Sequence, residues 1–210
     1  ETDCQPKNVD IENFTKRKPH DLNEKKKDIA ISFYWREDRL WFSPVFFNKL
    51  FEIGFFKYLF FLVQAVKIIW LFYKIKQQIP NAVFFLVGIG KQIKFPAWIN
   101  DFRIAKFSQE EDKKMCEIYA KSDLIIGTLG SHMILPSALA GMTVEIIKDH
   151  LIGCFGQDVV ITPQLRDLDP RLFSFLHRYA PIDISVRSLS AMVTSMLVDY
   201  QYSKMYFPKA

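Results

Sequence analysis

The sequence of 210 residues predicts an α/β fold, in which one Rossmann-like domain carries a parallel sheet flanked by helices on both faces. Three observations indicate this class. Short apolar segments alternate with longer helical segments, and no sustained hairpin pattern occurs. The short segments are continuously apolar, as expected of strands that are buried on both faces. Glycine, hydroxyl and basic residues follow them, which is typical of turns at the edge of such a sheet.

The predicted domain extends over residues 29–205. Its predicted strands are 29–35, 82–87, 103–107, 124–126, 143–147 and 158–161, and its predicted helices are 48–78, 108–121, 132–140 and 186–202. Pro80 is expected to stop the first helix. Ser108 precedes Glu111 by three residues, and this capping-box spacing predicts the start of the second helix. Gly141 is expected to end the third helix.

Residues 1–28 are polar, charged and without periodicity, which predicts a flexible arm or linker, and residues 206–210 are a short tail. The formal net charge of +5 suits an acidic partner such as nucleotide-sugar phosphates, anionic lipid or nucleic acid. We do not expect nucleic acid among them. Cys4, Cys116 and Cys154 are scattered, which argues against a disulfide framework and favours a reducing, cytoplasmic compartment.

Residues 55–73 are apolar enough to raise the question of a membrane span. Lys57, Gln64, Lys67 and Lys74 interrupt them and lie on one arc of roughly 100° on a helix. We therefore predict an amphipathic helix that packs on the core. The alternative is a helix whose lysine-edged face rests on an anionic membrane surface, which would place the protein at the membrane periphery.

Candidate ligand-binding residues stand directly after the predicted strands, because ligands of parallel α/β sheets bind outside the carboxyl ends of the strands. These residues are basic, glycine-rich and hydroxyl-rich, a combination that suits a pyrophosphate. Each has a structural alternative, since glycines can simply permit a turn and the charges of residues 36–39 can neutralise one another. The candidates are Arg36, Arg39, Gly88, Gly90, Lys91, Phe107, Ser108, Gly127, Thr128, Gly130, Ser131 and His132.

Several other kinds of site lack their sequence signatures. The dinucleotide fingerprint GxGxxG would need a glycine where Ile93 stands, and no Walker loop is present. Neither HExxH nor GxSxG occurs, and no pair of carboxylates follows a strand. We therefore predict no metal ion and no bound cofactor.

The order of the segments resembles the carboxy-terminal, donor-binding half of GT-B glycosyltransferases. The resemblance is carried by residues 81–90 (NAVFFLVGIG), by residues 118–124 (IYAKSDL), and by a glycine-bearing elbow that leads to residues 138–141 (ALAG). Each of these motifs is short, and their shared order is more specific than any one of them.

This resemblance implies a nucleotide-diphospho-sugar donor and metal-independent transfer of the sugar to a glycan or glycolipid acceptor. Gly130, Ser131 and His132 would hold the diphosphate, and Arg36 and Arg39 would neutralise the leaving group. The catalytic role would thus fall to the two arginines and the histidine.

Phe107 and Ser108 would lie beside the nucleoside base. Ser137 stands where many family members carry a ribose-binding glutamate. The acceptor site and catalytic base of the family lie in an amino-terminal half for which this sequence has no room, so a missing segment or a partner subunit is expected to supply them. Two alternatives remain open: a nucleotide-sugar epimerase of the same fold, and a non-catalytic domain that binds a membrane surface.

Overall fold

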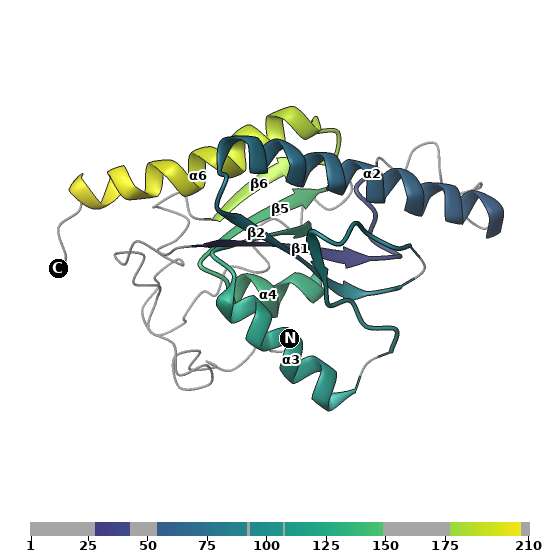
Figure 1. Ribbon diagram of the computed structural model, residues 1–210. Coiled ribbons are helices and arrows are strands. Elements are labelled where there is room, and N and C mark those ends of the chain that lie inside the picture. Colours follow the sequence, from purple (N-terminus) through teal and green to yellow (C-terminus); the bar gives the residue numbers. More distant parts are fainter. Residues whose placement is uncertain (1–27, 43–53, 92, 107, 149–176, 207–210) are drawn as a thin grey trace, which may run out of the picture.

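A computed structural model describes residues 28–42, 54–91, 93–106, 108–148 and 177–206 (Figure 1). It contains one six-stranded, fully parallel sheet with helices on both faces, which confirms the predicted fold class. The strands are β1 (Ile29–Arg36), β2 (Ala82–Ile89), β3 (Ile99–Asp101), β4 (Leu124–Thr128), β5 (Met142–Ile147) and β6 (His177–Pro181). The helices are α2 (Gly54–Gln78), α3 (Gln109–Lys121), the 3-10 turn η2 (Ser131–Met133), α4 (Ile134–Leu139) and α6 (Val186–Tyr206).

The strand order in the sheet is β3-β2-β1-β4-β5-β6. The chain runs outward from β1 through β2 to β3, then returns and continues from β4 on the other side of β1. Connections on the two sides of β1 therefore diverge, and the carboxyl ends of β1 and β4 border the crevice in which open α/β sheets bind ligands.

Two apolar cores cover the two faces of the sheet. Ile31, Phe33 and Trp35 alternate along β1 and point into the larger core, which α2 and α6 complete. Tyr34 points the other way, into a smaller core formed with α3 and α4. Figure 1 shows the same division, with α2 and α6 above the sheet and α3 and α4 below it.

The sequence prediction was wrong about the strand at residues 103–107. The third strand is Ile99–Asp101, and only Ile104 forms a further bridge, to Ile89. Arg103 explains the displacement: its side chain is 1% exposed, pairs with Asp101, and lies over the rings of Trp35 and Phe95. Because the Arg103 guanidinium turns into the core, this short segment does not continue as a regular strand.

The sixth strand was not predicted. Its sequence, HRYAP, has little apolar character, because it lies at the end of the sheet and pairs only with β5. The predicted strand at residues 158–161 lies outside the described residues, as do residues 1–27 of the predicted arm and the first six residues (48–53) of the predicted long helix.

The long helix packs on the core as predicted, but two residues of its polar arc, Gln64 and Lys67, turn inward. Gln64 is buried and accepts a hydrogen bond from the Trp41 amide at 3.0 Å. Lys67 donates to the Trp41 carbonyl at 2.8 Å, and its ammonium lies 4.0 Å from the centre of the Trp41 ring. Burial lowers the pKa of Lys67 to about 8. The polar arc therefore holds the segment that follows β1, and the apolar side of α2 is left exposed.

Candidate functional site

Polar side chains gather at the carboxyl ends of β1 and β4, where the strand order changes direction. Arg36 ends β1, and Arg39 follows in the next turn. The Thr128 hydroxyl, at the end of β4, donates to the Arg39 carbonyl at 3.0 Å and ties the two turns together. Ser131 and His132 follow β4 directly. The topology thus assembles one part of the predicted site from segments about 90 residues apart.

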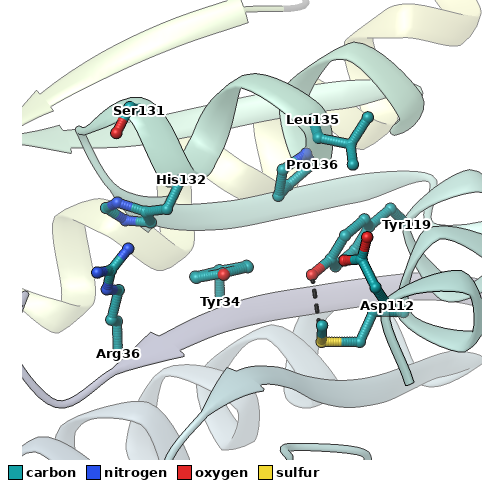
Figure 2. A pocket seen from close by; sticks show the side chains of 9 residues that line it. Tyr34, Arg36, Asp112, Tyr119, Ser131, His132, Leu135 and Pro136 are labelled. Carbon is teal, nitrogen blue, oxygen red and sulfur yellow. Dashed lines mark hydrogen bonds between the residues drawn. The ribbon is translucent and has the colours of Figure 1, made fainter. Parts of the chain in front are cut away.

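A pocket of about 270 Å³ opens beside these turns, on the side of the sheet that α3 and α4 cover. Figure 2 shows Arg36 and His132 at one end of it, Asp112 and Tyr119 at the other, and Tyr34 between them. The Tyr34 ring lies 5.2 Å from the His132 ring and 6.1 Å from the Tyr119 ring, measured between centroids. The lining residues are Tyr34, Arg36, Asp112, Met115, Tyr119, Ser131, His132, Leu135 and Pro136.

The phenols of this pocket stay neutral. Burial raises the pKa of Tyr34, with a smaller opposing effect from Arg36, and burial also raises the pKa of Tyr119. The Tyr119 hydroxyl donates to the Met115 sulfur at 3.5 Å, the contact dashed in Figure 2. An aromatic wall with neutral hydroxyls suits stacking with a planar or sugar ring.

His132 is held uncharged by its surroundings. Burial lowers its pKa to about 4, and the positive charges of Arg36 and Arg39 act in the same direction. Its Nε2 atom is buried and has no hydrogen-bond partner among the described residues. A neutral imidazole nitrogen in this position can accept a hydrogen bond from a ligand hydroxyl or donate one to a ligand oxygen.

This pKa predicts a pH dependence of stability. The unfolded chain takes up a proton on His132 near pH 6.5, whereas the folded chain does so only near pH 4. Between these values the unfolded state binds more protons, so the contribution of His132 to stability is fully present above pH 6.5 and is lost progressively as the pH falls from 6.5 to 4. Urea unfolding should show a loss of about 2 to 3 kcal/mol on going from pH 7 to pH 4.5. His132→Phe should remove that part of the loss, and an unchanged profile in this variant would contradict the assignment.

Positive charge also converges on this edge from a third strand. Lys148 directly follows β5, and burial together with the charge of Arg39 lowers its pKa. Arg39 therefore acts electrostatically on both Lys148 and His132. The negative charge of Asp38 has the opposite effect on the pKa values of His132 and Lys148, and its carboxylate pairs with Arg36 at 2.7 Å. Arg36, Arg39 and Lys148 thus bring three positive charges to this edge, where Asp38 offsets part of the charge, and such a cluster of cations favours an anionic ligand.

Several predicted site residues have other tasks in the structure. The backbones of Gly88 and Gly90 exchange hydrogen bonds with Ile104, with N–O distances of 2.9 Å. Lys91 is exposed, and its charge acts on Asp101. Ser108 is the N-cap of α3 and accepts from the Glu111 amide at 3.2 Å, which confirms the capping prediction.

The remaining predicted residues also take part in packing. Ser137 is fully buried and donates to the Ile134 carbonyl at 3.1 Å, so its hydroxyl does not line the pocket. A Cβ atom at Gly127 would lie 2.3 Å from the Met133 sulfur, and one at Gly130 would lie 2.7 Å from the His132 ring. These two glycines therefore leave space for the side chains of the following turn. Phe107 lies outside the described residues.

Sequence reasoning missed four residues near the site: Tyr34, Asp112, Tyr119 and Lys148. The strand-end rule could have found Lys148, which follows a predicted strand directly. Asp112 and Tyr119 lie two turns apart on one side of α3, a spacing that by itself only indicates a buried helix face. Tyr34 was part of a predicted strand, but its direction depends on which helices cover each face.

Comparison of the sequence with family models and with curated proteins, and of the fold with solved structures, gives no match. Within the described ranges, no three histidine, cysteine, aspartate or glutamate side chains gather closely enough to hold a metal ion. The functional argument therefore depends on the geometry of this edge of the sheet.

Proposed function

We propose that this edge binds the diphosphate of a nucleotide-activated sugar, and that the domain is the donor-binding part of a GT-B-type glycosyltransferase. The observation that carries the proposal is the convergence of Arg36, Arg39 and Lys148 at the point where the strand order reverses. An open α/β sheet binds its ligand at such a point. The cations supply the charge that a diphosphate leaving group requires.

The way in which the phosphates are held would differ from that of dinucleotide-binding Rossmann domains. Those domains use a glycine-rich turn after the first strand and the start of a long helix. Here the turn after β1 is Arg36-Glu37-Asp38-Arg39, with no glycine, and the helix after β4 is only Ile134–Leu139. Side-chain charge would therefore do what backbone amides do in those domains.

The adjoining pocket supports a division of the ligand between two subsites. Its volume of about 270 Å³ is too small for a whole nucleotide-sugar and suits one ring of it. Tyr34 and Tyr119 offer aromatic surface to that ring, and Asp112 offers a carboxylate for its hydroxyl groups. With the ring there, a diphosphate would extend past His132 toward Arg36 and Arg39. A glycan or glycolipid acceptor that binds at the same edge would then receive the sugar.

Calorimetric titration of the full chain with nucleoside diphosphates and their sugar conjugates tests this proposal. We expect saturable binding, weakened roughly 10- to 100-fold in Arg39→Met and in Lys148→Met, because each charge-assisted hydrogen bond is worth about 1.5 to 3 kcal/mol. Lys113→Met removes an exposed lysine on α3 and should bind like the parent chain. Absence of binding to every nucleotide would refute the function, and binding unaffected by either variant would refute the site.

A further inference from the structure

The outward face of α2 is an apolar stripe. It consists of seven residues whose side chains are 38% to 62% exposed: Tyr58, Leu59, Leu62, Val63, Val66, Trp70 and Tyr73. At about 100° per residue they cover about 140° of the helix circumference. Within residues 58–73 of α2, every exposed side chain belongs to this stripe. An apolar surface this continuous marks an interaction site in a folded domain.

The composition and order of the stripe favour a lipid surface. Tyr58 lies at one end, Trp70 and Tyr73 lie at the other, and aliphatic side chains fill the middle. Tryptophan and tyrosine are the residues enriched at the boundary between lipid and water, because each joins an apolar ring to a polar tip.

The charges around the stripe determine the kind of lipid. α2 contains four lysines and no aspartate or glutamate. Helical spacing places Lys74 along one border of the stripe and Lys76, which also donates to the Ala82 carbonyl at 2.8 Å, along the other. Lys67 lies beside Lys74 but is bound to the Trp41 carbonyl. Lysines that flank an apolar face pair with anionic headgroups when that face is buried at the interface. A symmetric contact between two copies of the stripe would instead bring lysines close to lysines.

The helix cannot cross the bilayer while the domain stays folded. By length and composition Phe56–Gln78 could span a membrane. Its inward face, however, packs on the sheet through Phe61, Ile68, Leu71 and Phe72, all fully buried. A lipid contact must therefore be limited to the outward face, with the helix axis along the membrane plane.

We propose that the α2 stripe docks the domain on an anionic bilayer surface. The α2 and α6 layer lies on one side of the sheet, and the pocket lies on the α3 and α4 side (Figure 1). Membrane contact through the stripe would thus leave the pocket uncovered. This inference does not depend on the proposed nucleotide chemistry.

Co-sedimentation of the full chain with vesicles tests the proposal. We expect binding to vesicles made of equal parts phosphatidylcholine and phosphatidylglycerol, and much weaker binding to phosphatidylcholine alone. Val66→Ser combined with Trp70→Ser should reduce binding at least tenfold. Trp98→Ser is the matched control, because Trp98 is 44% exposed but lies just before β3 and is not part of the α2 stripe; its ring packs against Phe84. An unchanged circular dichroism spectrum and an unchanged urea midpoint in the double variant would show that the domain is still folded.

Quenching by lipids brominated in the acyl chain provides a second, independent readout. Trp35 and Trp41 are buried, so quenching should come from Trp70 and disappear in Trp70→Phe but persist in Trp98→Phe. Vesicle binding that survives the double substitution would overturn the proposal and assign the contact to another part, such as the basic residues 16–27. Loss of a dimer in the double variant, seen by sedimentation velocity, together with no vesicle binding by the parent chain, would assign the stripe to a second copy.

Discussion

Gly88→Ala is expected to destabilise the fold by about 4 kcal/mol or more, or to prevent folding altogether. Gly88 has a φ of +105°, a backbone conformation that side chains with a Cβ atom rarely adopt. A Cβ atom there would also lie 2.1 Å from the carbonyl oxygen of Trp35, on the neighbouring strand. That oxygen belongs to the central ladder between β1 and β2, so relief requires the two strands to separate.

Gly90→Ala is the matched control for this prediction. Gly90 has a similar φ of +113°, but the atoms nearest to its added Cβ belong to the side chain of Glu37, the closest at 2.3 Å. Because a flexible, partly exposed side chain can move more easily than a backbone carbonyl, the cost should be limited mainly to the backbone conformation, about 1 to 2 kcal/mol. Urea unfolding of both variants measures the difference. Equal losses would show that the clash with the Trp35 oxygen is relieved without separating the strands.

Arg103→Met should cost about 3 kcal/mol, the second-largest effect that we expect. The Arg103 guanidinium is 1% exposed, pairs with Asp101 at 2.7 Å, donates to the Ile93 carbonyl, and lies 5.1 Å from the centre of the Trp35 ring. It thereby fixes the irregular segment between β2 and α3. Methionine fills a similar volume but removes the donor of the Ile93 carbonyl and leaves the Asp101 carboxylate only the backbone amide of residue 103, at 3.1 Å.

Arg36→Met is the matched control, since Arg36 pairs with Asp38 at the same distance of 2.7 Å but is 33% exposed, and Asp38 is 59% exposed. Exposed pairs contribute less than about 1 kcal/mol, so this variant should unfold almost like the parent chain. Chemical denaturation with tryptophan fluorescence, to which the contact with Trp35 contributes, checks both variants. Similar losses in the two would contradict a special role for the buried pair.

Among sequence predictions, those that concern local pattern fared best. The continuously apolar runs at residues 82–87 and 124–126 became β2 and β4, because such runs are stable only where both faces of a strand are covered. Ser108 caps α3 because its side chain can reach the Glu111 amide within one turn, without any tertiary partner. The strand-end rule also selected Arg36, Ser131 and His132, which do share a pocket.

Predictions that required the direction of a side chain were less successful. Arg103 looked like part of a strand, and the sequence contained no signal that its charge would turn inward onto two aromatic rings. The glycines of the elbow were predicted to cradle a phosphate, which stays a prediction; the structure adds that Gly127 gives space to Met133 and Gly130 to the His132 ring. A glycine in a turn looks the same in a sequence whether its missing Cβ makes room for a ligand or for a neighbouring side chain.

The sequence by itself determined the fold class, the course of most strands and helices, and the edge of the sheet at which to look for a ligand. Periodicity and capping are local properties, and residues close in the chain express them directly. Only the tertiary structure decided that Lys148 joins the two arginines, since strand order is a property of the whole sheet. It also decided which way α2 faces: the polar groups of Trp41 needed Gln64 and Lys67 as partners, and this turned the apolar stripe outward.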